Sequence, residues 1–328
     1  MSFSFAKDAP EGFTNSVKKV AIVGAGGHIG KAIAENILKT RQHTVTAITR
    51  PNSNSPLPDG LEKAVVDYQD EKSLISALTG QDLLVITLSL HAPPGTHTAL
   101  VKAASKAGVR YVMPNVYGIN LATSEQLRRD LPVSQKILSN IAEVEEFGMI
   151  SVSLMCGLWY EYSIAFGPST FGFDFDNRTV VMYDDGKKVI NTSTWAQCGR
   201  AVASLFSQKI LPDDEGDKSV TISDFYNKIL YVSSFKISQT DMFESVKRVT
   251  GTTDQDWKIS HVETGARYRE AMEELKQGKT EGFHKSIYAR AFFPRGDADF
   301  EPNTDRLGLS VEDLDERTRL GITLKGSL

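Results

Sequence analysis

An apolar stretch that breaks into glycines constrains this chain more than any other feature. Residues 20–30 read VAIVGAGGHIG, and residues 31–38 continue as KAIAENIL. This order predicts a buried strand, a tight turn and a helix. Gly24 would allow the turn, Gly27 would let the backbone approach a phosphate, and Gly30 would let the helix pack closely on the strand.

The turn and the start of this helix form a candidate dinucleotide site. The first N–H groups of a helix have no intrahelical partner, and the helix dipole is positive at that end. A pyrophosphate is stabilised there, so we expect cofactor contacts at the three glycines and at His28 and Ile29. A structural glycine turn is the alternative, but the strand before it and the helix after it favour the nucleotide site.

Short apolar runs alternate with helical patterns after the turn. The runs lie at 44–49, 64–66, 83–88, 109–113 and 151–154, and the helical patterns lie at 73–78, 98–107 and 134–147. Strands that are each followed by a helix predict parallel crossovers. We therefore expect an α/β fold with a Rossmann-type doubly wound parallel sheet over residues 1–157, whose ligand crevice lies at the carboxyl ends of the strands.

The pattern changes beyond Gly157. Aromatic residues gather at 159–175 without a clear period, and we expect loops there. Thr194 and Ser238 stand where they can cap helices at 195–206 and 242–249, and a short terminal helix is expected after residue 311. These features predict a smaller α/β substrate-binding region over residues 158–328, with the chain free to cross back between the two parts.

The composition is that of an ordinary globular protein. The chain has 328 residues, 41% hydrophobic and 24% charged, which suits one large domain or two closely joined ones. A formal net charge of -4 argues against a nucleic-acid partner, which needs a basic face. The first residues do not resemble a signal peptide and no run is long enough to span a bilayer, so we expect no membrane partner and a cytoplasmic location.

The two cysteines, Cys156 and Cys198, lie far apart in the sequence. They suit buried free thiols in a reducing compartment better than a disulfide framework. Neither has the spacing of a metal ligand, and no metal is expected.

The residue after the second strand distinguishes NAD from NADP in folds of this kind. An acid there binds the ribose 2'-hydroxyl, whereas an arginine accommodates a 2'-phosphate. This chain has Arg50 and no acid, so we expect NADPH, with a solvated surface cation as the alternative. The remaining cofactor contacts are expected after the third, fourth and fifth strands, at Asp67, Tyr68, Leu88, Ser89 and Asn115. Asp67 could instead cap a helix.

These residues resemble the atypical short-chain dehydrogenases of the NmrA-like and isoflavone reductase-like group, especially their fungal CipA-type oxidoreductases. The resemblance rests on the glycine triplet, on Arg50, on YVMPNVYG at residues 111–118 and on the strand-to-helix run at 189–205. Members of the group typically carry a Pro-Ser-Glu-Phe-Gly-like string after the fifth strand and a lysine in the following helix. Here the string is PNVYG, with Val116 in place of the acid, and the lysine that matches by position is Lys136.

The resemblance implies that Lys136 lies near the nicotinamide. An ammonium there could stabilise a developing enolate or alkoxide and deliver a proton. The alternative is a solvated lysine on an amphipathic helix. Tyr117 follows the fifth strand and could orient a carbonyl or help to donate a proton, although packing between strand and helix is equally consistent with its position.

Several aromatic residues could form a substrate pocket. His91 follows the fourth strand in a loop expected to pass the nicotinamide, and its alternative role is that of a turn residue before prolines. The other expected pocket residues are Trp159, Tyr160, Tyr162 and Phe292, which could wall a flat conjugated substrate or could simply be core.

We therefore expect an NADPH-dependent reductase of a small aromatic or polyketide-like ketone, enone or related double bond. A non-catalytic NAD(P)-binding redox sensor of the NmrA type is the alternative, since it needs the cofactor site but no productive lysine. A sugar-nucleotide epimerase on the same fold is disfavoured, because the Tyr/Lys pair that such chemistry uses is missing at its usual place. The oligomeric state stays open, with a homodimer among the options.

Overall fold

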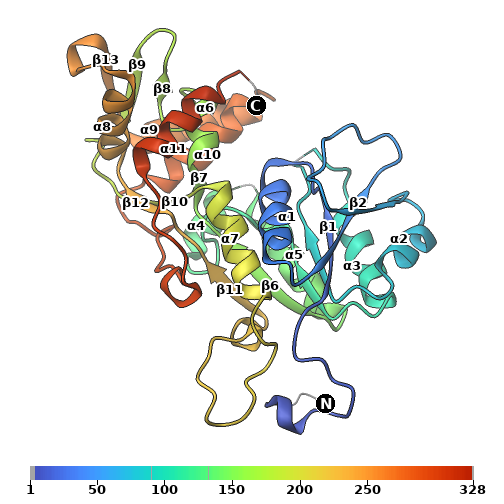
Figure 1. The fold of residues 1–328 in the computed structure, drawn as a ribbon. Coiled ribbons are helices and arrows are strands. Elements are labelled where there is room, and N and C mark those ends of the chain that lie inside the picture. The colour runs from blue at the N-terminus through green and yellow to red at the C-terminus, as the bar shows by residue number, and fades with distance from the viewer. Residues whose placement is uncertain (1–3, 90, 132, 327–328) are drawn as a thin grey trace.

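The computed structural model describes residues 4–89, 91–131 and 133–326. A seven-stranded sheet forms the centre of its larger part (Figure 1). The strand order is β11-β6-β5-β4-β1-β2-β3, and all neighbouring strands pair in parallel. The strands are β1 (Lys19–Val23), β2 (Thr44–Thr49), β3 (Glu62–Val65), β4 (Leu83–Ile86), β5 (Tyr111–Met113), β6 (Ile150–Met155) and β11 (Lys228–Tyr231). The predicted doubly wound parallel sheet is confirmed.

The strand order reverses between β1 and β4. Val23 at the end of β1 pairs with Ile48 on one side and with Ile86 at the end of β4 on the other. The chain runs outward from β1 in both directions, so the loops after these two strands diverge and leave room for a ligand at the carboxyl edge of the sheet. This edge is where the sequence places the crevice.

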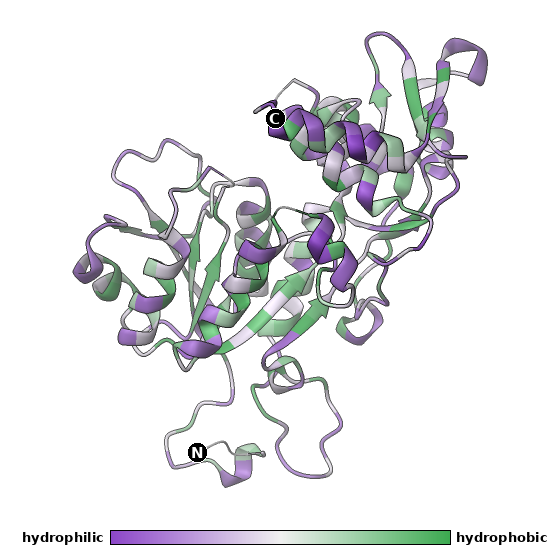
Figure 2. Ribbon diagram, turned by 180° about the vertical axis from the view of Figure 1, so that it is seen from behind, coloured by the Kyte–Doolittle hydropathy of each residue, from purple (hydrophilic) through white to green (hydrophobic). Residues whose placement is uncertain are grey.

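Helices cover both faces of the sheet. On one face lie α1 (His28–Thr40) and α7 (Trp195–Phe206), and on the other lie α2 (Glu71–Leu78), α3 (Thr96–Lys106) and α5 (Ser134–Glu146). The sequence of β4 explains this arrangement: its side chains alternate, so that Leu83 and Val85 join the first core and Leu84 and Ile86 the second. Figure 2 shows the mostly hydrophobic strands of this sheet beside helices that carry both hydrophobic and hydrophilic residues.

The chain returns to the large sheet after residue 157. Both β11 and α7 come from the later part of the sequence, and α7 packs closely along α1 (Figure 1). Gly199 permits this approach, because a Cβ atom at this position would lie 2.3 Å from the carbonyl oxygen of Ala32. The sheet that carries the nucleotide turn is therefore buttressed by a helix from the second half of the chain.

The second part has its own core. Its elements are β7 (Leu158–Trp159), α6 (Tyr160–Phe166), β8 (Phe173–Asp174), β9 (Thr179–Tyr183), β10 (Ile190–Ser193), β12 (Phe235–Ile237), α8 (Gln239–Thr250), β13 (Lys258–Val262), α9 (Thr264–Lys276), α10 (Glu281–Ala291) and α11 (Leu314–Thr323), joined by α4 (Glu125–Asp130). Two small sheets have the orders β12-β10-β7 and β13-β9-β8. Short 3-10 turns lie at Ala6–Asp8, Ile222–Phe225, Asp254–Asp256 and Asp305–Leu307.

Three sequence predictions for this second part are confirmed, and one is wrong in part. Thr194 accepts a hydrogen bond from the backbone of Gln197, and Ser238 forms a capping box with Asp241, so both predicted caps are confirmed. The terminal helix is confirmed as α11. The loops expected over residues 159–175 are wrong in part, because α6 forms there and buries Tyr160 and Ile164 in the second core.

A buried arginine ties α4 to α10. The Arg290 side chain is fully buried; its Nε donates to Asp130 at 2.6 Å, and its terminal nitrogens donate to Asp297 at 2.6 and 2.7 Å. Hydrogen bonds from the guanidinium hold the pKa of Asp297 down to about 2. The charge of Arg290 is thus compensated on two sides, as a buried cation requires.

We expect Gly199→Ala to destabilise the protein although alanine favours helix. The added methyl group would collide with the backbone of α1, at a cost of ~1–3 kcal/mol in the free energy of unfolding. Gly265→Ala is the matched control, since its Cβ would approach only the ends of two exposed side chains, Glu263 at 2.6 Å and Arg269 at 3.3 Å. Urea denaturation of both variants is the measurement, and equal stability would show that the α1–α7 contact is not tight.

Candidate active site

The glycine turn is shaped by contact between β1, α1 and β4. Gly24 has a φ of +80°, and its Cβ would lie 2.1 Å from the carbonyl oxygen of Thr87. A Cβ on Gly30 would lie 2.2 Å from the carbonyl oxygen of Gly24. Thr87 adds a hydrogen bond from its hydroxyl to the carbonyl of Val23 at 2.7 Å. These two glycines are required by packing alone.

Gly27, unlike Gly24 and Gly30, has room for a side chain. A Cβ there would approach no closer than 3.4 Å to the protein, and the nearest atom is the carbonyl oxygen of Gly24. Gly27 is the N-cap of α1, and within the described ranges no side chain caps this helix start. The N–H groups of His28 and Ile29 therefore remain available to an anion, as a pyrophosphate site needs.

Arg50 directly follows β2 and is exposed. Burial raises the pKa of the neighbouring Tyr68, and the positive charge of Arg50 opposes that rise, so the two side chains are close. Among the residues that the structure describes, no carboxylate lies within ion-pair distance of Arg50. A cation without a partner beside this edge fits a 2'-phosphate.

Asp67 makes a local turn. Its carboxylate accepts the backbone N–H of Gln69 at 2.9 Å, whereas Asp70 is the N-cap of α2. Asp67 therefore does not cap that helix, and its exposed side chain stands beside Tyr68 at the end of β3.

Asn115 clamps the ends of β4 and β5 together. Its side-chain oxygen accepts from the backbone of Leu88 and its amide donates back to Leu88, both at 3.2 Å. The amide of Asn140 in α5 donates to the Asn115 carbonyl at 3.1 Å. Ser89 and His91 lie in the exposed loop that follows, where the Ser89 hydroxyl accepts from the His91 backbone at 3.2 Å.

Lys136 lies exposed in the first turn of α5. Along this helix it shares one face with Asn140 and Glu143, because the spacing is i, i+4 and i+7. The positive charge of Lys136 acts on His97, a buried residue of α3. No carboxylate of the described chain pairs with Lys136. The structure thus presents this ammonium at the carboxyl edge with its charge uncompensated.

The Tyr117 side chain packs against the first core. Its hydroxyl is buried and lacks a hydrogen-bond partner within the described residues, and it lies near Cys156 and Cys198 in the first core. Burial raises the pKa of this phenol well above its usual value. Packing, the alternative role weighed from the sequence, suits this position better than proton donation.

The expected substrate-pocket residues separate into two groups. Trp159 and Tyr162 are partly buried and lie edge to face, with ring centroids 6.2 Å apart. Tyr160 and Phe292 are fully buried in the second core, where the Tyr160 hydroxyl is hydrogen-bonded to Thr318 at 2.7 Å.

A row of partly exposed rings begins at the glycine turn. His28 stacks on Trp195 with centroids 4.4 Å apart, and Trp195 lies 6.2 Å from Trp159. Tyr162 continues the row through a hydrogen bond to His284 at 2.9 Å. We call these rings the aromatic row: His28, Trp195, Trp159, Tyr162, Phe166 and His284. Trp195 and His284 carry no local sequence signal that marks them for this role.

Several buried polar atoms in or next to the aromatic row lack a hydrogen-bond partner among the described residues. The indole nitrogens of Trp159 and Trp195 and one carboxyl oxygen of Glu161 are buried without a hydrogen-bond partner in the described chain. Burial raises the pKa of Glu161 to about 7, and the nearby charge of Glu312 adds to the rise. Such groups cost free energy unless something hydrogen-bonds to them.

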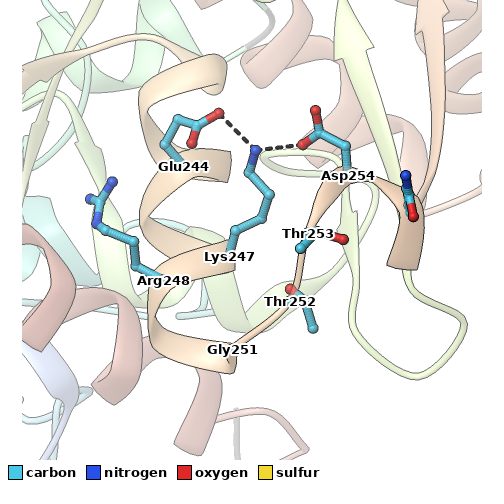
Figure 3. Close-up of a pocket in the computed structure, with 8 residues that line it drawn as sticks. Glu244, Lys247, Arg248, Gly251, Thr252, Thr253 and Asp254 are labelled. Carbon is cyan, nitrogen blue, oxygen red and sulfur yellow. Dashed lines mark hydrogen bonds and ion pairs between the residues drawn. The ribbon is translucent and has the colours of Figure 1, made fainter.

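Two surface depressions lie away from this edge. The larger, of about 710 Å³, is lined by α8 and the loop that follows it (Figure 3). There Lys247 is already paired with Glu244 and Asp254, while Arg248 pairs with Asp315. The other, of about 360 Å³, lies beside α5 and β11. Neither includes the glycine turn, and the paired charges in Figure 3 leave a ligand little to bind.

The described residues include neither a candidate membrane span nor a candidate metal cluster. No helix among them is long and apolar enough to cross a membrane. No group of three or more histidine, cysteine, aspartate or glutamate side chains among them could hold a metal ion.

Comparison with known proteins agrees with this geometry. A family model described as NAD(P)H-binding matches residues 24–146, so the predicted NAD(P)-binding domain is confirmed. Oxidoreductase aprR of Aspergillus flavus is 25% identical over 268 residues, which cover 80% of this chain and 84% of aprR. A solved isoflavone reductase superposes with a TM-score of 0.69 at 16% identity over 92% of this chain and 99% of that one.

Residues 24–146 therefore form an NAD(P)H-binding domain, and the chain is similar in sequence to a fungal oxidoreductase and in fold to isoflavone reductase. Other isoflavone reductase-like structures share the fold. AtPrR2, solved with NADP+ and (+)pinoresinol, has a TM-score of 0.70 at 16% identity and covers 94% of this chain and 100% of its own. The NADPH-dependent quinone oxidoreductase QOR2 of Escherichia coli has a TM-score of 0.66 at 17% identity and covers 91% and 98%.

We expect Arg50→Gln to weaken NADPH binding by about 10- to 100-fold, because a charge-assisted contact to the 2'-phosphate is lost. NADH affinity should stay within about twofold, since NADH lacks that phosphate. Arg110→Gln is the matched control: Arg110 is also exposed but precedes β5, at the opposite edge of the sheet. Calorimetric titration of each variant with both nucleotides measures this, and equal losses for NADPH and NADH would remove Arg50 from cofactor selection.

Proposed function

We propose that this protein is an NADPH-dependent reductase of an oxygenated aromatic ketone, enone or related conjugated double bond. The observation that carries the proposal is the aromatic row, which starts at the phosphate-binding turn itself through the stack of His28 on Trp195 at 4.4 Å. A flat conjugated molecule could lie against these rings with its reactive carbon near the cofactor, since stacked and edge-on aromatic contacts favour such ligands.

The cofactor would be held by groups that the structure leaves available. The uncapped start of α1 would bind the pyrophosphate, and Arg50 would bind the 2'-phosphate. The clamp of Asn115 on Leu88 would fix the backbone beside the nicotinamide. NADPH, when bound, supplies a hydride to the acceptor carbon of the substrate.

Lys136 would complete the reduction. Hydride addition to a ketone or enone leaves negative charge on the substrate oxygen, and an ammonium without a carboxylate partner can stabilise this charge. Lys136 would then pass one proton to the substrate, directly or through water, and recover it from solvent, to which its side chain is exposed. One hydride and one proton together account for the two hydrogens gained.

The oxygenated character of the substrate rests on the unpartnered polar atoms. Two indole N–H groups of the row itself, from Trp159 and Trp195, could donate to a carbonyl or hydroxyl oxygen. The similar proteins named above include a quinone oxidoreductase and one solved with pinoresinol, which is consistent with ligands that carry oxygen on conjugated rings.

We expect Lys136→Met to lower kcat about 10²- to 10⁴-fold, the usual contribution of a general acid, while NADPH affinity changes less than threefold. Lys39→Met is the matched control, because Lys39 is an exposed lysine in the last turn of α1. The measurement is NADPH oxidation with a panel of single-ring and fused-ring enones and quinones, together with calorimetric titration of NADPH.

The panel also separates the two candidate functions. Turnover that is higher for fused-ring than for single-ring substrates supports the reductase and the aromatic row as its substrate wall. Full activity of the Lys136→Met variant would remove Lys136 from the mechanism. Tight NADPH binding without turnover of any substrate would favour the non-catalytic sensor.

A further inference from the structure

A buried histidine is paired with a glutamate near Lys136. His97 is the second residue of α3 and is 6% exposed. Its Nδ1 lies 2.9 Å from one carboxyl oxygen of Glu143 in α5, and the other oxygen accepts the hydroxyl of Thr98 at 2.7 Å. The pair therefore joins α3 to α5 at the carboxyl edge of the sheet.

These contacts define one tautomer of His97. Because a carboxylate only accepts, Nδ1 carries the proton and Nε2 keeps its lone pair. Nε2 faces the backbone N–H of Asn115 at 3.5 Å, a long contact that a neutral ring can accept. Burial lowers the pKa of His97, the hydrogen bond that its ring donates to Glu143 opposes this change, and the positive charge of Lys136 lowers the pKa further. The ring is neutral at pH 7.

The His97–Glu143 pair is linked to two candidate site residues, Asn115 and Lys136. Asn115, which His97 contacts, is the residue that clamps Leu88. Glu143 stands on the same face of α5 as Lys136, two turns further along. Facing His97, the charged groups of α5 are Glu143 and Lys136, whereas the neighbouring groups from α3 and from the end of β5, Thr98 and Asn115, are uncharged.

We propose that His97 and Glu143 form a positioning pair for the reduction, in which neutral His97 holds the Asn115 backbone in place and spares Lys136 a neighbouring positive charge. The inference rests on the proposed function. Protonation of His97 turns Nε2 into a donor that faces another donor at Asn115, and it adds a second cation beside the Lys136 ammonium. Both changes disturb the edge on which the substrate would react.

The proposal has a definite pH dependence. The pKa of His97 lies below the ordinary histidine value of about 6.5. The neutral, active form therefore predominates above pH 6.5 and is lost as the pH falls through the lowered pKa of His97. A reductase that depends on the pair should lose kcat on this acid side while KM for NADPH changes little.

The test compares pH profiles of His97→Gln, Glu143→Gln and the control Glu146→Gln, which alters an exposed carboxylate near the end of α5. His97→Gln should lower kcat about 3- to 10-fold at neutral pH, leave KM for NADPH within twofold and remove the acid-side loss. Glu143→Gln should move that loss to lower pH, because the carboxylate that favours protonated His97 is gone. The control should keep the original profile.

Nuclear magnetic resonance gives a second readout that needs no turnover. The ring resonance of His97 should titrate below pH 6.5, and the amide resonances of Leu88 and Asn115 should shift with it. In His97→Gln these amide shifts should disappear, and in Glu143→Gln the His97 titration should move to lower pH. The titration remains informative even where one variant fails to fold.

Two failures are distinguishable. Unsubstituted protein that reduces no substrate at any pH contradicts the proposed function, while the titration of Leu88 and Asn115 still tests whether His97 controls this edge. Turnover with an acid-side loss that persists unchanged in His97→Gln overturns the positioning pair and leaves the reductase standing. Amide resonances of Leu88 and Asn115 that do not shift as His97 titrates would also overturn the positioning pair.

Discussion

The contact of the glycine turn with β4 determines the rest of the site. Gly24 and Gly30 meet Thr87 and each other so closely that a side chain on either would collide with backbone atoms at 2.1–2.2 Å. This contact brings the start of α1 to the point where the strand order reverses. The uncapped N–H groups of α1 and the first ring of the aromatic row, His28, take their positions from it.

The second constraint is the close packing of α7 on α1. Without a side chain at Gly199, the two helices can lie along each other, and Trp195 at the start of α7 reaches His28 at the start of α1. The cofactor turn and the aromatic row are therefore held by the same pair of helices. A substitution that disturbs the contact between α1 and α7 is expected to weaken the binding of both substrate and nucleotide.

The parts of the structure that local patterns encode were predictable. The glycine turn, the alternating strands and helices of the sheet, and the caps at Thr194 and Ser238 each follow from residues that are neighbours in the sequence. Arg50 and Lys136 could be named because their positions relative to strands are readable, while the roles assigned to them remain proposals.

The parts that depend on distant contacts were not predictable. The aromatic row joins residues as far apart as His28 and His284, and the pair of His97 with Glu143 joins α3 to α5, which β5 and α4 separate in the sequence. Helix α6 was missed because its aromatic residues lie both in the second core, as Tyr160 does, and in the partly exposed aromatic row, as Tyr162 and Phe166 do, which gives the segment no clear hydrophobic period.

The most direct test of this account is a crystal structure of the protein with NADPH. We predict the pyrophosphate at the start of α1, the 2'-phosphate on Arg50, and the nicotinamide between the Asn115 clamp and the aromatic row, within one water of Lys136. A nicotinamide directed away from the row, or NADPH bound in the depression beside Lys247, would contradict the account.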